Sequence, residues 1–488
     1  MLRSPGLILA AVIMASVALV AGLVQLQKPD TTAHDNPRAA MATPAAHTSH
    51  ETFYTGKSLT TGPEVTAACI ECHAQAAQDF MHTAHWTWAG DHAERDGQSV
   101  AIGKKNLLNN FCISVELNWA ACTTCHAGYG WRDENFDFAE ATNIDCLVCH
   151  DQSGQYRKQG GTGGMPAADV DLLEAAKSVA RPSRVNCGTC HFSGGGGDAV
   201  KHGDLDGTMV HPTADIDVHM GRYDLQCVDC HRTTKHEIAG RSMSVSISNT
   251  RRATCVDCHA QTPHPDQRLN AHTTAIACQT CHIPEMAVRA PTKMTWDWSK
   301  AGEDRPEADP HEYLKIKGEF TYESNAAPEY YWYDGHAERY LKGDEIEPKL
   351  VTQINRPLGD ATDPAAKIWP FKVHRGKQVY DTNTNKFLVP KTAGEGGYWT
   401  DFDWDQALRL GSEKSGLDYS GEYGFAATEM FWPLSHMVAP ANQALQCADC
   451  HGAAGRMDFE ALGYKGDPMQ RGARRQQGVL RQGNEGAR

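Results

Sequence analysis

The sequence contains the pattern C-x-x-C-H eight times, and this pattern constrains the fold more than any other feature. Sixteen of the 17 cysteines fall into these eight pairs, and a histidine directly follows every pair. Two thiols three positions apart on one helical turn reach the two vinyl groups of a single porphyrin, and the adjacent imidazole reaches its iron. A zinc site or a disulfide ladder gives no reason for the repeated histidine. We therefore predict eight covalently bound c-type haems.

The motifs assign the attachment residues and the proximal iron ligands directly. The attachment cysteines and proximal histidines are Cys69, Cys72, His73; Cys122, Cys125, His126; Cys146, Cys149, His150; Cys187, Cys190, His191; Cys227, Cys230, His231; Cys255, Cys258, His259; Cys278, Cys281, His282; and Cys447, Cys450, His451. Their starts lie 53, 24, 41, 40, 28, 23 and 169 residues apart. Without a fixed period, the chain is not a solenoid of identical units.

Hydrophobic residues make up only 41% of the chain, so haems must fill much of the interior. We expect a mainly α fold with extensive irregular loops and little β structure, packed around the eight haems as one multihaem cytochrome c body. The expected segments are a signal peptide or membrane anchor (1–27), a flexible tether (28–60), a seven-haem region (61–285), an aromatic-rich wrapping segment (286–446), the eighth motif (447–470) and a disordered tail (471–488).

An uncharged apolar run of 21 residues, 6–26, predicts export from the cytoplasm. Its length lies between a signal-peptide core and a bilayer span, so a cleaved signal and an uncleaved inner-membrane anchor both remain open. The periplasm is the expected compartment, because covalent haem attachment takes place there in bacteria.

The net charge of −14 excludes a nucleic-acid-binding role on electrostatic grounds. The chain has no nucleotide-binding or flavin fingerprint, so we expect electrons from a redox protein or a membrane quinol-oxidising cytochrome. An anionic substrate would need local positive charge. Assembly into a homo-oligomer is left open.

Sixteen of the 24 histidines lie outside the motifs and are candidates for the sixth iron position. Those in the expected tether, His34, His47 and His50, are excluded. Two histidines close to motifs, His236 and His272, are expected to reach neighbouring haems rather than their own. The preferred distal ligands are His85, His202, His219, His236, His264, His272 and His436, with His82, His211 and His374 as close competitors.

Three segments together with the motif spacing resemble the octahaem tetrathionate reductase family. They are Asn109-Asn-Phe-Cys112, Cys278-Gln-Thr-Cys-His-Ile-Pro284, and the ending that runs from Cys450-His-Gly to Leu462-Gly-Tyr-Lys-Gly-Asp-Pro468. The resemblance covers about residues 65–470. It implies seven haems with two histidine ligands each and one active haem, the second, with a lysine as distal ligand and a free cysteine beside it.

Lys201, Cys112 and Asp198 match that family's active-site positions. On the residues alone, Cys112 is the single thiol that no haem uses, and an inert buried thiol is the alternative. Lys201 follows a glycine run and Asp198, in a loop flexible enough to enter a haem pocket; a solvated surface lysine is the alternative. Asp198 would orient the lysine or relay a proton, unless it is simply an exposed carboxylate.

The resulting interpretation is a periplasmic oxidoreductase that passes electrons to a Lys-ligated haem. The resemblance implies tetrathionate as substrate, and nitrite and hydroxylamine also fit an iron with an exchangeable ligand. A non-catalytic electron conduit is the first alternative. A hydroxylamine-oxidoreductase-like enzyme is the second, since Tyr330, Tyr331 or Tyr340 could form a haem cross-link. A nitrite reductase with a C-x-x-C-K motif is excluded, because no such motif occurs.

Eight intact motifs predict eight covalent haem additions on the mature chain. The intact mass should show all eight, and acid-acetone extraction of the denatured protein should release no haem, because thioether bonds survive it. Fewer than eight additions, or extractable haem, would contradict the motif analysis.

Overall fold

A computed structural model describes residues 48–471 except 96, 111–114 and 307. The predicted export segment, most of the expected tether, Cys112 and all but the first residue of the expected tail therefore lie outside the described residues. Within the part that is described, no helix is both long enough and apolar enough to cross a bilayer.

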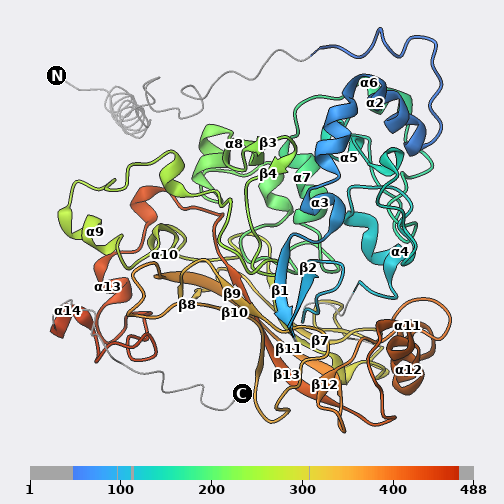
Figure 1. Ribbon diagram of the computed structural model, residues 1–488. Helices are drawn as coiled ribbons and strands as arrows, with labels where there is room; N and C mark the ends of the chain where they lie inside the picture. The colour runs from blue at the N-terminus through green and yellow to red at the C-terminus, as the bar shows by residue number, and fades with distance from the viewer. Residues whose placement is uncertain (1–47, 96, 111–114, 307, 472–488) are drawn as a thin grey trace, which may run out of the picture. The chain divides into compact units, whose positions relative to one another are not determined.

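Most helices are short, as expected, and many coincide with haem motifs, although α2 has 19 residues (Figure 1). Their bounds are α2 Gly62–Phe80, α3 Ala84–Thr87, α4 Trp119–Cys122, α5 Leu147–His150, α6 Leu172–Lys177, α7 Arg184–His191, α8 Cys227–Cys230, α9 Gln267–His272, α10 Cys278–His282, α11 Tyr398–Asp401, α12 Trp404–Ser415, α13 Cys447–Cys450 and α14 Pro468–Arg471. The second motif continues from α4 into a 3₁₀ turn, Thr123–Cys125, and the sixth forms another, Cys255–Asp257.

Several motif helices begin with a capping box that the motif itself supplies. In the fifth motif, the Asp229 carboxylate accepts the backbone N–H of Gln226 at 2.8 Å. Asp449 does the same for Gln446 at 2.7 Å in the eighth motif. These aspartates occupy the position before the second cysteine, so the short helix that presents both thiols is encoded within the motif.

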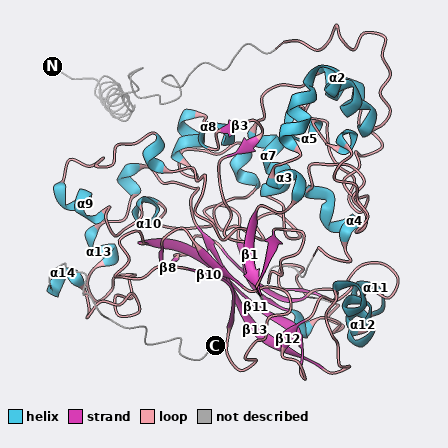
Figure 2. Ribbon diagram, viewed as in Figure 1, coloured by secondary structure: helices cyan, strands magenta, loops and turns pink. Residues whose placement is uncertain are grey.

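The segment between the seventh and eighth motifs forms a nine-stranded sheet, with strand order β6-β7-β5-β11-β13-β10-β9 and with β8 and β12 also paired to β11 (Figure 2). Its strands are β5 Thr292–Asp297, β6 Tyr313–Leu314, β7 Gly318–Glu323, β8 Glu329–Tyr333, β9 Ala337–Arg339, β10 Thr352–Pro357, β11 Lys367–Asp381, β12 Lys386–Phe387 and β13 Tyr423–Pro433. Two small hairpins, β1 Asp91–Arg95 with β2 Gln98–Ile102 and β3 Thr233–Thr234 with β4 Glu237–Ile238, lie among the motifs.

This sheet corrects the expectation of little β structure. The long strand β11 pairs antiparallel with β13 over eleven residues and parallel with β5. Residues 370–374 of β11 are buried on both faces, so the alternation of polar and apolar residues that signals a strand is missing there. The 286–446 segment is therefore a structured support rather than a wrapping.

The aromatic residues of this segment pack, as expected, but many pack against each other. Trp296 and Trp298 stack at 4.7 Å, and Tyr398 and Trp404 stack at 4.0 Å, within one apolar cluster beside α11 and α12. This cluster gives the sheet its own core, in addition to any contact with porphyrin.

The end of the expected tether is also structured. Tyr54 is 2% exposed and packs with Val65 and Leu147 in a cluster under α2. The compact body therefore includes residues from 48 onwards.

After the last strand of the sheet, the chain returns to the haem motifs, as predicted for the eighth motif. Leu445, just before the eighth motif, donates its backbone N–H to Cys281 O at 2.9 Å. The seventh motif is tied to β11, because Ala277 N and the Thr280 hydroxyl both donate to Ile368 O. The seventh and eighth motifs therefore meet at one edge of the sheet.

Residues 108–110, which precede Cys112, lie against β11. Asn110 Nδ2 donates to His374 O at 2.7 Å, and its Oδ1 lies 3.0 Å from His374 Nδ1. Gln378 Nε2 donates to Asn109 O at 2.7 Å. Gly376 permits this approach, since a Cβ there would lie 3.0 Å from Asn110 Cβ and 2.9 Å from Thr428 Oγ1.

We predict that Gly376→Ala lowers the free energy of unfolding by about 1–3 kcal/mol, because the added methyl overpacks the contact between Asn110 and the sheet. Denaturant unfolding of the holoprotein measures this change. The control is Lys377→Ala, at the next, exposed position of β11. Equal stability of Gly376→Ala and the unaltered protein would show that residues 108–110 do not depend on this contact.

Candidate haem sites and active centre

Seven motif histidines each face a second histidine ring. The ring centroids lie 6.0–6.4 Å apart in the pairs His50–His73, His85–His191, His236–His150, His436–His231, His219–His259, His264–His282 and His272–His451. An iron held at about 2 Å from one nitrogen of each ring keeps two imidazole centroids about 6 Å apart. The paired rings therefore fit seven haems with two axial histidines each.

The Nδ1 atoms of several paired rings are already engaged, which leaves Nε2 for a metal. His150 Nδ1 lies 2.9 Å from Ala180 O, and His231 Nδ1 lies 2.7 Å from Ala239 O. His451 Nδ1 lies 2.6 Å from an Asp467 oxygen, and His436 Nδ1 lies 3.1 Å from an Asp204 oxygen. Such bonds fix the tautomer and orientation of metal-binding imidazoles.

Six of the preferred distal histidines occupy this arrangement: His85, His219, His236, His264, His272 and His436. His236 and His272 face other motifs rather than their own, as expected. Their ligation of iron stays a prediction.

His202 and His50 require corrections. The His202 ring packs edge-on against Trp432 at 4.9 Å, and no motif histidine is its ring partner in the described chain. His50 takes the seventh place, facing His73. The composition of residues 28–60, which are rich in Pro, Thr and Ala, argues against His50 as a ligand. The hydrophobic Phe53-Tyr54 pair just after His50 is the sequence feature that indicates a packed segment there. The competitor His82 bonds Gln78 O, and His374 bonds Asn110.

His126, in the second motif, has different surroundings. Its ring contacts Trp86, Trp88, Trp131, Phe136 and Phe138, with centroids 4.8–6.1 Å away. Its Nε2 lies 2.7 Å from Trp86 O. Within residues 48–471, apart from the short gaps, no histidine ring pairs with His126 at the spacing of the other seven.

Lys201 lies beside this motif. Cys125 and Cys190 both act electrostatically on its ammonium, which places it between the second and fourth motifs. Burial, together with the nearby Lys104 ammonium, lowers the pKa of Lys201 to about 8. A Cβ at Gly194 would lie 2.2 Å from Lys201 Nζ, so glycine there leaves room for the amine. More of this lysine is neutral near pH 7 than of an ordinary one, and a neutral amine can bind a metal.

Two further lysines that the sequence did not single out, Lys104 and Lys158, add positive charge here. Both act, with Lys201, on Cys125. Lys104 Nζ lies 4.2 Å from the centroid of the Trp88 ring. The amines of Lys104 and Lys201 therefore lie near the second motif, whereas the Lys158 ammonium is paired with Asp145. Positive charge there favours an anion, in a chain that is acidic as a whole.

The other predicted active-site residues have less direct support. The exposed Asp198 carboxylate accepts the backbone N–H of Gly207 at 2.8 Å, so it closes the loop that carries Lys201. Tyr330 lies near Cys281 and Cys450, far along the chain from the second motif. The Tyr331 hydroxyl donates to Glu329, and the Tyr340 hydroxyl donates to Asp344 O. None of these contacts brings a tyrosine to the second motif.

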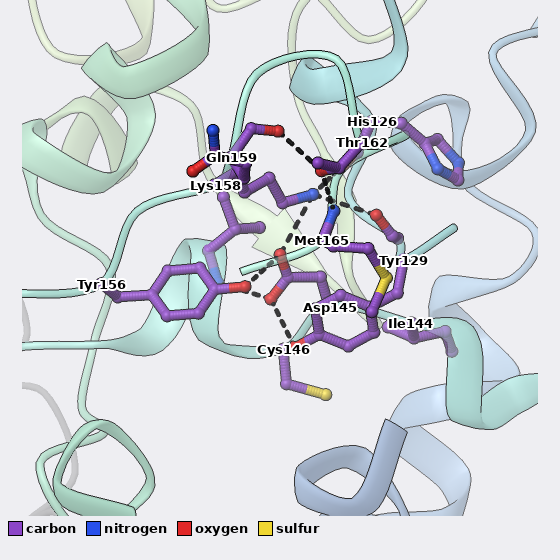
Figure 3. Close-up of polar contacts among 12 residues, drawn as sticks. His126, Tyr129, Ile144, Asp145, Cys146, Tyr156, Lys158, Gln159, Thr162 and Met165 are labelled. Carbon is purple, nitrogen blue, oxygen red and sulfur yellow. Dashed lines mark hydrogen bonds and ion pairs between the residues drawn. The ribbon is translucent and has the colours of Figure 1, made fainter. Parts of the chain in front are cut away.

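A buried ion pair joins the second and third motifs (Figure 3). Lys158 Nζ lies 3.1 Å from Asp145 Oδ2, with the two side chains 2% and 0% exposed. The Tyr129 and Tyr156 hydroxyls also donate to this carboxylate, at 2.9 and 2.7 Å. Lys158 Nζ further donates to the backbone oxygens of His126 and Gly128. The pair therefore fixes the backbone of the proximal histidine.

Cysteines of different motifs lie next to one another and connect the attachment sites. Cys69 lies close to Cys146, Cys125 to Cys190, Cys187 to Cys227 and Cys255 to Cys278. Cys149 also lies near Cys187, Cys230 near Cys258, and Cys281 near Cys450. All eight motifs thus belong to one connected set, which suits electron transfer between adjacent haem edges.

Paired imidazoles, attachment cysteines and their mutual proximity define a multihaem cytochrome c. Residues 68–151 match the family described as cytochrome c554 and c-prime, and residues 293–454 match bacterial cytochrome c. The crystal structure of an octaheme cytochrome c from Shewanella oneidensis is 49% identical to this chain. It covers 84% of this chain and 96% of its own length, with a TM-score of 0.80. This chain belongs to the octahaem cytochrome c family.

A more distant relative is an uncharacterized protein of Archaeoglobus fulgidus. It is 25% identical over 237 residues, which are 37% of this chain and 77% of that protein. The family assignment agrees with eight c-type haems as the cofactors.

We predict that Lys158→Met lowers the free energy of unfolding by about 3–5 kcal/mol, because it leaves the buried Asp145 carboxylate without its cation. Chemical unfolding monitored by absorbance measures this. Lys158→Met combined with Asp145→Asn should cost less than the two single changes added together, since the pair acts as a unit.

The control is the exposed pair of Arg157 with Asp169, where Arg157→Ala should leave stability nearly unchanged. Strictly additive losses at Lys158 and Asp145 would contradict the coupling.

Proposed function

We propose that this octahaem cytochrome is a periplasmic tetrathionate reductase whose active haem is the one attached by Cys122 and Cys125, with His126 as proximal and Lys201 as distal ligand. The observation that carries the proposal is the contrast between seven motif histidines that face a second imidazole and His126, which has no such partner in the described chain. The His126 ring lies among aromatic rings, its Nε2 contacts Trp86 O, and Lys104 and Lys158 act on it electrostatically. The family resemblance supplies tetrathionate. Nitrite and hydroxylamine stay as further substrates to be measured.

The haem iron, when bound, supplies electrons one at a time and a coordination position that a weaker ligand can vacate. The residues contribute the rest. Lysine is the exchangeable ligand: as a neutral amine it binds the metal, and as a displaced, protonated ammonium it attracts an anion. The Lys104 ammonium strengthens that attraction, because electrostatic interactions are stronger where water is excluded.

The proposed reaction needs two electrons and no net proton. Tetrathionate accepts both electrons, its central S–S bond breaks, and two thiosulfate ions leave. The electrons come from a redox protein or a membrane quinol-oxidising cytochrome, and travel through the seven remaining haems. Cys112 would provide a soft contact for sulfur near the metal. Asp198 would act indirectly, by closing the loop of Lys201.

Replacing Lys201 by alanine should convert one haem of eight to a high-spin form and lower turnover of tetrathionate, while the other seven accept electrons as before. Electron paramagnetic resonance of the oxidised protein and steady-state kinetics measure the two effects. The control is Lys349→Ala, at an exposed position outside the motifs.

Unchanged spectra in Lys201→Ala would refute lysine ligation and favour the alternative of an electron conduit. Cys112→Ser tests the thiol separately: equal turnover of every substrate would make Cys112 a structural residue.

A further inference from the structure

The loop that carries Lys201 rests on the sheet through two buried polar side chains, Thr292 and Lys372. Thr292 begins β5 and is 1% exposed. Its hydroxyl lies 2.7 Å from Ala199 O and 2.8 Å from His202 O, the carbonyls on either side of Lys201. The Thr292 side chain thus contacts the backbone of the loop both before and after Lys201.

Lys372 lies in β11 and is fully buried. Its Nζ donates to Val200 O and Lys201 O, both at 2.9 Å, and to the Thr292 hydroxyl oxygen at 2.6 Å. An ammonium has three N–H donors, and these three acceptors use all of them. The Lys372 amine is therefore directed at the main chain of Lys201 and of Val200.

The part of the loop that follows Lys201 also packs closely against the rest of the protein. A Cβ at Gly203 would lie 3.3 Å from Lys372 Cδ and 2.7 Å from Met286 Sδ. The Asp204 carboxylate accepts the backbone N–H groups of Ser435 and His436, at 2.6 and 2.9 Å. Residues 199–204 are thus fixed along their backbone, while the long Lys201 side chain keeps its own rotatable bonds.

Strand packing alone does not explain a lysine at position 372. A methionine would fill the same volume without burying an ammonium, which is unfavourable unless its donors are satisfied. Here two donors bond the loop, and the third bonds Thr292, which itself contacts the loop. The benefit is that a ligand whose backbone is fixed in advance binds a metal with less loss of conformational freedom than one on a mobile loop.

We propose that Lys372, supported by Thr292, is a positioning residue that fixes the Lys201 backbone and so determines how readily the Lys201 amine exchanges with substrate at the haem of the second motif. This inference rests on the proposed ligation by Lys201. It assigns the sheet a role in ligand exchange, in addition to its role in folding.

The experiment measures ligand exchange in the full-length holoprotein with cyanide as probe. Cyanide binds the ferric iron only where the sixth ligand leaves. In Lys372→Met and in Thr292→Val, the cyanide-binding rate of one haem should rise about tenfold, because the Lys201 amine spends less time in the binding position. The high-spin fraction of the same haem should rise with it, and the spectra of the other seven should stay unchanged.

Two control variants remove comparable bonds elsewhere in the sheet. Asn355→Leu removes buried hydrogen bonds from Asn355 to Met243 O and to both backbone groups of Phe431. Thr295 lies on the same strand as Thr292, and Thr295→Val removes the hydroxyl contact of Thr295 with Thr321. Both should leave the cyanide rate unchanged. The same acceleration in these controls would overturn the inference, since general loosening of the sheet would then explain it.

The outcomes separate the two proposals. An altered haem in Lys201→Ala, with wild-type cyanide rates in Lys372→Met and Thr292→Val, refutes the positioning role alone. An unaltered spectrum in Lys201→Ala refutes lysine ligation itself. If Lys372→Met fails to load eight haems, the pair Thr292→Val and Thr292→Ser decides: acceleration with valine and a normal rate with serine support the inference, and equal rates refute it.

Discussion

A porphyrin attached through two thioethers and one motif imidazole has one axial position left, and the rest of the structure depends on which side chain fills it. A second imidazole saturates the iron and leaves it an electron carrier; a lysine is displaceable and leaves it able to react. The described chain provides a facing imidazole at seven motifs. Some of these histidines come from segments far from the motif they face, as His436 does from His231, and others lie nearby, as His264 does to His282. Iron ligation by the distant pairs would join segments far apart in the chain, in the way that an apolar core does in other proteins.

The nine-stranded sheet gives this haem-linked chain a rigid surface. Its strand β11 carries Lys372 and His374 on one face, and each contacts a different loop that the resemblance assigns to the active centre. Side chains on a strand are placed more accurately than those on a loop, because ladder hydrogen bonds fix the backbone. The sheet bonds the loop of Lys201, and the buried pair of Asp145 with Lys158 holds the backbone of His126.

The local features could be predicted from the sequence, and the non-local ones could not. Haem attachment depends on five consecutive residues, so all eight motifs could be recognised in the sequence. Distal ligation depends on which histidine the fold brings to each iron. Nearness to a motif served for His236 and His272, but no such signal distinguished His202, and the composition of the tether wrongly removed His50. The sheet was missed because β11 is buried on both faces around Lys372, where a strand loses its alternating pattern. Lys104 and Lys158 carry no motif that distinguishes them from surface lysines.

The order of the paired histidines along the chain bears on biosynthesis. Five motif histidines face a partner that precedes them, as His73 faces His50, so both rings exist once the motif has been made. The third motif must wait for His236, and the fifth must wait for His436, more than two hundred residues after His231. If the paired rings bind iron as proposed, a chain that stops before His436 would leave the fifth haem without its second imidazole, because synthesis proceeds from the N-terminus. The iron of that haem would be open to other ligands, which would chemically distinguish truncated chains from finished ones.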